Sequence, residues 1–157
     1  MNAFRLRWWV VGLLLVICIL ASGSPNRLSA ASGPGQAEVV RQIMVPAEDR
    51  FTPFGITVRV GQVVEWVNND TDDHTVVSDD AFNTAGQRGV NVLLPANGGT
   101  FRLKFNHPGM FPFYCRFHAV LDADNQPKAP GPNGGIQDPN GNFGTPMNGV
   151  ITVLGQD

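Results

Sequence analysis

The feature that most restricts the fold of this chain is a series of short runs in which β-branched or aromatic residues alternate with polar ones. Glycine, proline and asparagine turns separate the runs, and no long stretch has the periodicity of a helix. The pattern therefore predicts an all-β fold, a Greek-key β-sandwich. We expect strands at residues 39–45, 56–60, 63–68, 74–78, 100–105, 110–115 and 149–154.

Alternation within the runs also predicts which side chains face the core, because successive residues of a strand point to opposite faces. Trp66, in the middle of a strand-like run, is expected in the core as well. Residues 90–94 are ambiguous, and with the preceding connection 81–89 they fit either a strand or a short helical turn. The expected core positions in the alternating runs are Val58, Val60, Phe101, Leu103, Phe105, Ile151 and Val153.

The N-terminal segment has the order of a secretory signal. Arg5 and Arg7 precede a 14-residue apolar run, 8–21, and small polar residues follow it. The run is shorter than the roughly 20 residues of a membrane-spanning helix. We therefore interpret residues 1–23 as a signal peptide, with an N-terminal membrane anchor as the alternative. Residues 24–38 would form a flexible tether, and the folded domain would occupy 39–157 in a periplasmic or other extracytoplasmic compartment.

Export changes the meaning of the two cysteines. Cys18 lies in the segment that a signal peptidase would remove, which leaves Cys115 without a disulfide partner in the same chain. In an oxidising compartment a lone thiol is stable when it is buried, paired with another chain or bound to a metal. A buried structural cysteine is the alternative to a metal ligand at this stage.

The balance of charge argues against nucleic acid as a partner. The chain has 11 basic and 13 acidic residues, a net charge of −2, and no run of basic residues. Acidic residues cluster around His74. We interpret them as a solvated turn in preference to a docking patch for a basic partner. The cluster consists of Asp70, Asp72, Asp73, Asp79 and Asp80.

Four residues together suggest a metal site. Cys115 and His118 form a C-x-x-H motif at the end of a strand-like run, His74 follows a turn, and Met147 opens the last run. Two imidazoles, a thiolate and a weak thioether are the ligand set of a mononuclear copper site that transfers single electrons. Zinc is the alternative metal, because it also binds His₂Cys sets. His107, in a turn between strands, is expected to be exposed and not a ligand.

Three segments resemble the cupredoxins, the small blue copper proteins such as plastocyanin, pseudoazurin and halocyanin. The run VEWVNND at 64–70, followed by HTVV at 74–77, resembles the family's strand, turn and first histidine. The run FNHPGMFPFYCRFH at 105–118 resembles its cysteine and second-histidine segment, and MNGVITV at 147–153 resembles its closing methionine segment. The resemblance implies a cupredoxin-like β-sandwich that holds one copper ion, Cu(I) or Cu(II). Its ligands would be His74, Cys115, His118 and Met147.

The resemblance also implies a function. Members of the family carry one electron between a donor and an acceptor redox protein, through the exposed edge of the second histidine, and are not enzymes. Here that edge belongs to His118, and an apolar stretch at 119–121 would extend beside it. An alternative is an open copper site, as in nitrosocyanin, that binds or converts a small molecule under a loop lid. Copper delivery or storage is a third and weaker interpretation.

The departure from the family pattern is an insertion, 119–146, at the metal end. Of its 28 residues, 17 are Pro, Gly, Asn or Asp, a composition that cannot form its own core. If the insertion bulges outward, Met147 can still reach the copper as the axial ligand; otherwise Met147 is a core residue. A calcium site in the insertion is a minor alternative. Its oxygen ligands would come from Asp122, Asp124, Asp138 and Asn140.

Overall fold

The computed structural model describes residues 38–156 apart from 79–84, 88, 139–140 and 143. The predicted signal or anchor, 1–23, and nearly all of the predicted tether lie outside the described residues. Within the described part of the chain, no helix has the length and apolar character needed to cross a membrane.

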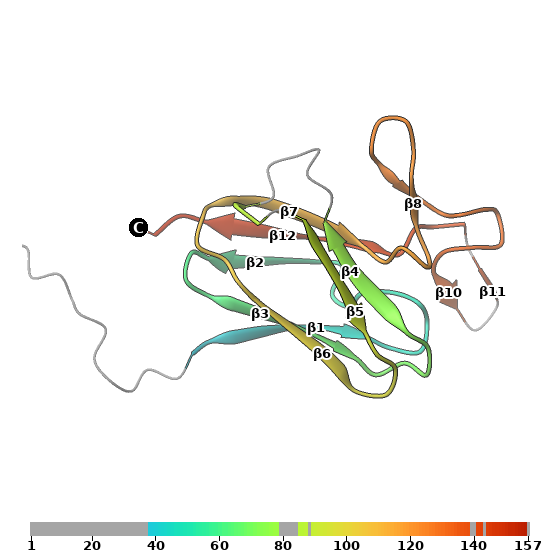
Figure 1. The fold of residues 1–157 in the computed structure, drawn as a ribbon, viewed down its shortest axis with the longest axis horizontal. Helices are drawn as coiled ribbons and strands as arrows, with labels where there is room; N and C mark the ends of the chain where they lie inside the picture. The colour runs from blue at the N-terminus through green and yellow to red at the C-terminus, as the bar shows by residue number, and fades with distance from the viewer. Residues whose placement is uncertain (1–37, 79–84, 88, 139–140, 143, 157) are drawn as a thin grey trace, which may run out of the picture. The chain divides into compact units, whose positions relative to one another are not determined.

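The described residues form an all-β fold built on two sheets, as predicted (Figure 1). One sheet has three strands in the order β1-β3-β6, and the other has five in the order β2-β12-β7-β4-β5. The strands of the smaller sheet are β1 (Val40–Val45), β3 (Val63–Asn68) and β6 (Gly99–Lys104). Those of the larger sheet are β2 (Gly55–Arg59), β4 (His74–Ser78), β5 (Val90–Leu94), β7 (Gly109–Tyr114) and β12 (Asn148–Leu154).

Both sheets mix parallel and antiparallel pairs, as expected when the chain crosses repeatedly from one sheet to the other. β1 runs parallel to β3, and β2 runs parallel to β12. β12 also pairs antiparallel with β7, with Ile151 opposite Phe111. The last strand of the chain thus lies between β2 and β7, and the residue that precedes it lies beside the end of β7.

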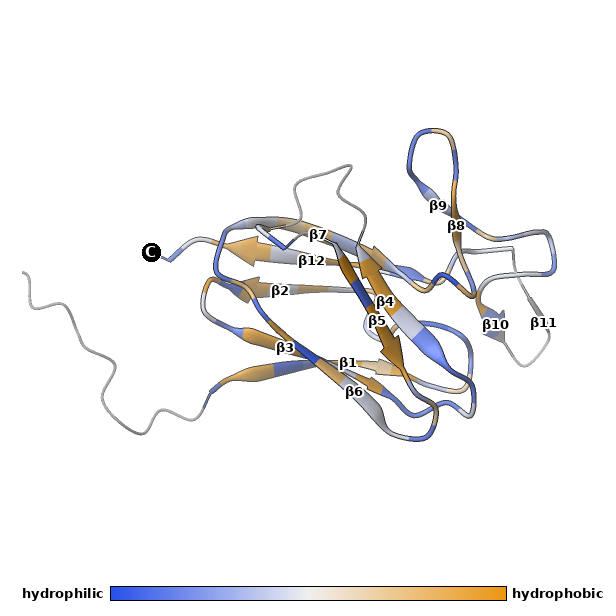
Figure 2. Cartoon of the chain, viewed as in Figure 1, coloured by the Kyte–Doolittle hydropathy of each residue, from blue (hydrophilic) through white to orange (hydrophobic). Residues whose placement is uncertain are grey.

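The core lies between the two sheets and combines aliphatic with aromatic side chains. Figure 2 shows hydrophobic residues along the strands of both sheets. Trp66 is fully buried, stacks on Phe101 at 5.4 Å between ring centroids and meets Phe113 edge-on at 5.4 Å. Val58, Phe105, Ile151 and Val153 are buried, and Val60, Phe101 and Leu103 are partly buried against the same cluster, so the predicted core positions are confirmed.

Residues 90–94 are a strand. They form β5, which pairs antiparallel with β4 and places Val76 opposite Val92. The alternative of a short helical turn is therefore wrong for these residues, because the unpaired edge of β4 is a stronger partner than local helix contacts. Of the preceding connection, 81–89, residues 81–84 and 88 lie outside the described residues.

The insertion forms two small hairpins beside the sandwich (Figure 1). β8 (Val120–Leu121) pairs with β9 (Pro127–Lys128), and β10 (Gln137–Asp138) pairs with β11 (Gly141–Asn142). Between the hairpins, Ile136 is partly buried against the core and donates its N–H to the carbonyl of Thr145 at 2.7 Å.

The calcium interpretation of the insertion gains no support from the residues described. Asp122 Oδ1 accepts the backbone N–H groups of Asp124 and Gln126, each at 2.9 Å, and so caps the turn between β8 and β9. The side chain of Asp138 and all of Asn140 lie outside the description.

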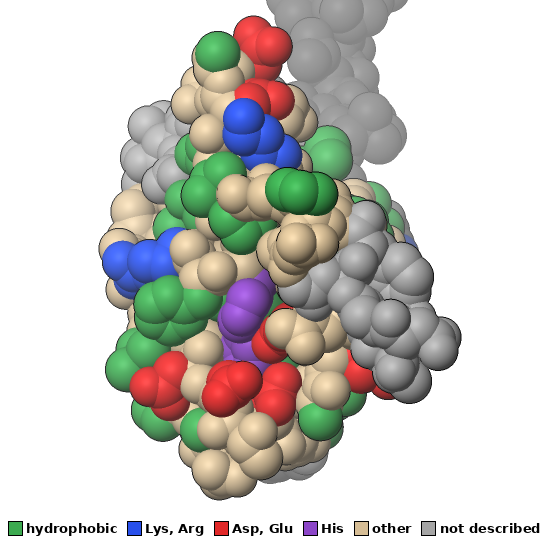
Figure 3. All heavy atoms as spheres, turned by 90° about the vertical axis from the view of Figure 1, so that its right-hand side faces the viewer, with side chains coloured by type: hydrophobic (Ala, Val, Ile, Leu, Met, Phe, Trp, Pro, Cys, Tyr) green, Lys and Arg blue, Asp and Glu red, His purple; other side chains and the backbone are tan. Residues whose placement is uncertain are grey.

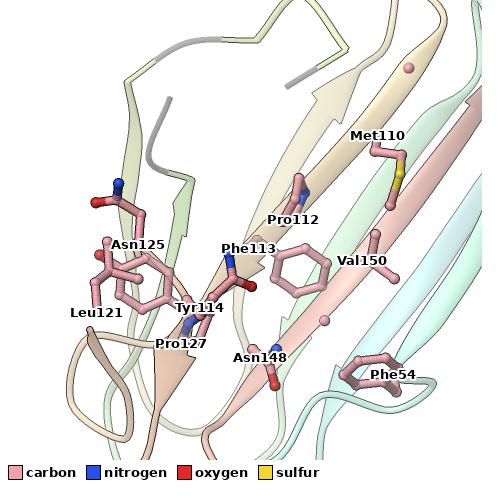
Figure 4. Close-up of a pocket in the computed structure, with 13 residues that line it drawn as sticks. Phe54, Met110, Pro112, Phe113, Tyr114, Leu121, Asn125, Pro127, Asn148 and Val150 are labelled. Carbon is pink, nitrogen blue, oxygen red and sulfur yellow. The ribbon is translucent and has the colours of Figure 1, made fainter. Parts of the chain in front are cut away.

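An apolar pocket of about 600 Å³ lies along β7 and β12, beside the β8–β9 hairpin of the insertion (Figure 4). Met110, Pro112 and Tyr114 of β7 line it together with Phe54 and Leu121. Alternation along β7 turns Phe111 and Phe113 into the core, and turns Met110, Pro112 and Tyr114 to the other face of the sheet.

Candidate metal centre

His74 begins strand β4 and lies wholly inside the protein, with no exposed surface. Its ring is held at both nitrogens. Nδ1 lies 3.7 Å from Cys115 Sγ, and Nε2 lies 3.3 Å from Asp70 Oδ2. A contact on each side of the ring fixes its orientation, with Nδ1 directed at the thiol.

The loop before His74 is held by the side chain of Asn68 at the end of β3. Its Nδ2 donates to the carbonyls of Asp72 at 2.8 Å and Leu94 at 3.0 Å. Its Oδ1 accepts the N–H of Asp70 at 3.0 Å. One buried amide therefore ties the loop both to itself and to β5, which fixes where His74 starts its strand.

Asp70 corrects the prediction of a solvated acidic turn. Asp72 and Asp73 are exposed, as expected, and Asp79 and Asp80 lie outside the described residues. Asp70 is instead buried, with 6% of its surface exposed. Burial raises its pKa, but hydrogen bonds from the Thr71 backbone and His74 outweigh that effect, so the pKa of this carboxyl lies below its usual value.

Cys115 and His118 lie in a tight turn directly after β7. The N–H of His118 donates to the carbonyl of Cys115 at 3.1 Å, and His118 Nδ1 lies 3.7 Å from Cys115 Sγ. Cys115 is completely buried, whereas 20% of the His118 side chain is exposed. The C-x-x-H spacing thus gives one candidate ligand inside the protein and one at its surface.

Thr75 offers the sulfur of Cys115 two further hydrogen-bond donors. Its backbone N–H lies 3.4 Å from Cys115 Sγ, and its hydroxyl lies 3.7 Å away. The same hydroxyl accepts the N–H of Arg116 at 2.9 Å, which ties β4 to the turn after β7. Sequence reasoning missed Thr75, although its place directly after His74 was the available signal.

The surroundings of Cys115 favour a thiolate. Burial raises the pKa of the thiol, but hydrogen bonds with His118 and then with His74 outweigh it and lower the pKa to about 5. The hydrogen bond with Cys115 is in turn the largest influence on the pKa of His118, and it raises that pKa. A hydrogen bond with Cys115 also raises the pKa of His74 against the opposing effect of burial. A thiolate is the form of cysteine that binds metals.

Met147 is positioned by the chain on either side of the thiolate. Its carbonyl accepts the N–H of Cys115 at 2.9 Å, and its own N–H donates to the carbonyl of His118 at 3.2 Å. Its side chain is fully buried in the same cluster as Cys115. The two ends of the insertion are therefore adjacent in space. Its 28 residues do not move the backbone of Met147 away from Cys115 and His118.

Asp49 is a residue of this region that the sequence did not reveal. It lies in the loop after β1 with a positive φ of 51°, and its carboxylate approaches Nε2 of both histidines. Burial raises its pKa, and the nearby His118 and His74 act in the opposite direction. The sequence around it, an ordinary polar turn, carried no signal of this position.

The donor set fits a single soft or borderline metal ion. The ligand atoms that His74, Cys115 and His118 offer all lie within 4.8 Å of one another, and all three residues are at least partly buried. Two imidazoles and a thiolate in this arrangement suit copper, and zinc among the alternatives. His107 is exposed in the turn between β6 and β7, outside this group, as predicted.

Comparison with known proteins distinguishes between these metals. The family model described as copper binding proteins, plastocyanin/azurin family, matches residues 43–123, more than half of the chain. The chain belongs to this family. It is therefore a cupredoxin, and copper is its cofactor, as the resemblance implied.

Individual relatives agree with this assignment. Plastocyanin from Ulva arasakii is 33% identical over 73 residues, which cover 44% of this chain and 74% of the relative. Plastocyanin from Scenedesmus fuscus is 29% identical over 72 residues, covering 43% of this chain and 74% of the relative. Among solved structures, a methionine-to-glutamine variant of amicyanin with Cu(I) has a TM-score of 0.50 at 16% identity, covering 75% of this chain and 85% of that one; this likeness shows the fold alone.

Proposed function

We propose that the protein is an exported carrier of single electrons, with one copper ion held by His74, Cys115 and His118 and by Met147 as a weak axial ligand. The observation that carries the proposal is the convergence of both histidine Nδ1 atoms on one buried sulfur, each at 3.7 Å. The copper supplies the Cu(I)/Cu(II) couple. A trigonal His₂Cys site with a long axial thioether suits one-electron transfer.

The protein's contribution is a site that changes little between oxidation states. His74 is locked between Asp70 and the thiol, and Cys115 is tied to Thr75 and to the backbone of Met147. Side chains fixed in this way by packing and hydrogen bonds hold their geometry closely. A site that moves little needs little reorganisation when an electron arrives or leaves, which favours a carrier.

The path for electrons would leave through His118, whose side chain is partly exposed while Cys115 and His74 are buried. Exposed apolar side chains lie near it in the sequence, with 50% of Phe117 and 40% of Val120 accessible. On strand β5, opposite Thr75, 49% of Leu93 is accessible as well. Figure 3 shows a histidine surface near the middle of this face, with hydrophobic side chains beside and above it and acidic ones below. Ala119 is buried, so the predicted apolar stretch 119–121 is exposed only in part.

Such a surface fits transient docking of a donor and an acceptor redox protein, because an apolar patch around a redox-active edge brings the two centres close. The short sequence 1–23 supports export to a periplasmic or similar compartment, by cleavage of a signal or by retention as an anchor. No enzymatic step is needed for this function.

The test is the spectrum of the purified protein loaded with Cu(II). We expect an intense visible thiolate-to-copper(II) band and a small copper hyperfine splitting in EPR. Cys115→Ser should abolish the band, because it removes the sulfur. His107→Ala is the matched control: it deletes an exposed imidazole outside the cluster and should leave the spectrum unchanged.

Two other results would contradict the proposal. Tight zinc binding with no visible band after Cu(II) addition would exclude a copper electron carrier. A weak or red-shifted band that responds to azide or nitric oxide would support the open-site alternative instead. None of the four proposed ligands lines the apolar pocket beside the insertion, so that pocket does not favour a small-molecule site at the copper.

A further inference from the structure

Asp49 contacts both histidines of the metal centre. Its Oδ1 lies 3.5 Å from His118 Nε2 and 3.7 Å from His74 Nε2, whereas Asp70 reaches only His74. These distances are longer than a usual N–H···O hydrogen bond, so the contact acts through charge. The Asp49 side chain is 7% exposed, so its charge is poorly screened by water.

Asp49 faces Nε2 of each ring, the nitrogen opposite the one that faces the thiol. Both rings direct Nδ1 at Cys115 Sγ, so Nε2 is the nitrogen that carries the proton when Nδ1 binds a metal. A carboxylate beside that nitrogen fixes the tautomer and ring orientation and increases the electron density of the ligand. Here one carboxylate acts on both imidazoles.

Asp49 is held in place from two directions. Two residues further on, Phe51 is buried and meets Phe113 edge-on at 4.8 Å between centroids. On the other side, the carbonyl of Glu48 accepts the N–H of Gln137 at 3.0 Å. Gln137 belongs to β10, so the insertion braces the loop that carries Asp49.

We infer that Asp49 is a positioning residue of the copper site, which orients His74 and His118 together and favours Cu(II) over Cu(I) through its negative charge. The inference rests on the proposed function, because it requires copper bound at Nδ1 of both rings. It also gives the insertion a role at the metal centre that needs neither a lid nor an open coordination position.

The test is the redox equilibrium of the copper-loaded full-length protein against a fixed mediator. In Asp49→Asn the shape and the positive φ are retained, because asparagine tolerates this backbone region, and only the charge is lost. We expect the equilibrium to shift toward Cu(I) by about tenfold, which for a one-electron couple is about 59 mV. Asp72→Asn is the matched control, since it removes the same charge from an exposed side chain in the neighbouring loop and should shift the equilibrium much less.

A second measurement on the unmodified protein keeps the inference testable if Asp49→Asn does not fold. In the diamagnetic Cu(I) form, NMR should detect the Nε2 protons of both His74 and His118 close to the β-protons of Asp49. Absence of these contacts would overturn the inference, as would equal shifts in Asp49→Asn and Asp72→Asn. A second bound metal ion per chain, held by Asp49, Asp70 and His74 Nε2, would overturn it too.

The two proposals fail in different ways. If the unmodified protein shows no thiolate-to-copper band, the proposed function is wrong. If the band is present and Asp49→Asn leaves the redox equilibrium unchanged, the copper site stands and only the role of Asp49 is wrong.

Discussion

The two halves of the metal centre are built on loops of very different length. His74 follows the short link 69–73 after β3, which Asn68 holds from inside. Cys115, His118 and Met147 belong to a segment that is interrupted by 28 residues. Both halves are nevertheless tied by hydrogen bonds: the first through the side chain of Asn68, and the second through the backbone bonds of Met147 with Cys115 and His118. The long loop can be accommodated because the entropy cost of closing a loop grows only slowly with its length.

The largest expected effect is on the pKa of the Cys115 thiol, which should change by different amounts when each histidine is removed. In the copper-free protein, ultraviolet absorbance should show the Cys115 thiolate forming as the pH rises through about 5. His118→Ala should raise this pKa toward the ordinary 9.0, because His118 is its strongest stabilising partner, and His74→Ala should raise it less.

The matched control for this titration is His107→Ala, which should leave the pKa of the thiol unchanged. Equal shifts in His74→Ala and His118→Ala would mean that the buried His74 and the partly exposed His118 stabilise the thiolate equally. No shift in either would show that the thiolate is not stabilised by these histidines.

The next largest effect concerns Met147, where the long loop returns. Because its side chain is fully buried, Met147→Ala should lower the unfolding free energy of the copper-free protein by about 2–5 kcal/mol. Met147→Leu keeps the volume and should cost less than about 1.5 kcal/mol. If Met147 is the axial ligand, Met147→Leu should raise the reduction potential and retain the visible band.

Denaturant unfolding followed by fluorescence measures the first effect, and redox titration measures the second. A Met147→Leu protein with an unchanged potential would leave Met147 as a core residue only. The two halves of the site would then contribute ligands from β4 and from the Cys115–His118 turn alone.

The smallest effect is expected from removing the insertion itself. Residues 120–145 could be replaced by a Gly/Ser linker of about four residues, since the carbonyl of His118 and the N–H of Met147 are 3.2 Å apart. Ala119, which is buried, would be retained. We expect the visible band to persist and the unfolding free energy to fall by about 1–2 kcal/mol, mainly from the lost packing of Ile136.

Loss of copper binding in the excised protein would contradict the idea that the loop ends alone fix Met147. Thermal unfolding and the copper spectrum of one preparation give both readings. The redox equilibrium of the excised protein should also move in the direction of Asp49→Asn, because the brace from Gln137 to Glu48 is gone.

Much of the fold could be predicted because its signals are local. Alternation along 56–60, 100–105 and 149–154 identified strands and core faces, and Trp66 was placed correctly in the core. Residues 90–94 remained ambiguous because their strand exists only through pairing with β4. The acidic turn was interpreted from composition, which cannot distinguish the buried Asp70 from the exposed Asp72.

The candidate site divides in the same way. The sequence by itself determined the ligand types, since Cys115, His118, His74 and Met147 each stand beside a strand-like run in a recognisable pattern. Only the tertiary structure decided that Met147 returns to the site after a long insertion, and that Asp49 from a distant loop approaches both histidines. The chemical type of each candidate ligand can be read directly from the sequence. The approach of a buried charge depends on packing between segments far apart in sequence, such as Phe51 on Phe113.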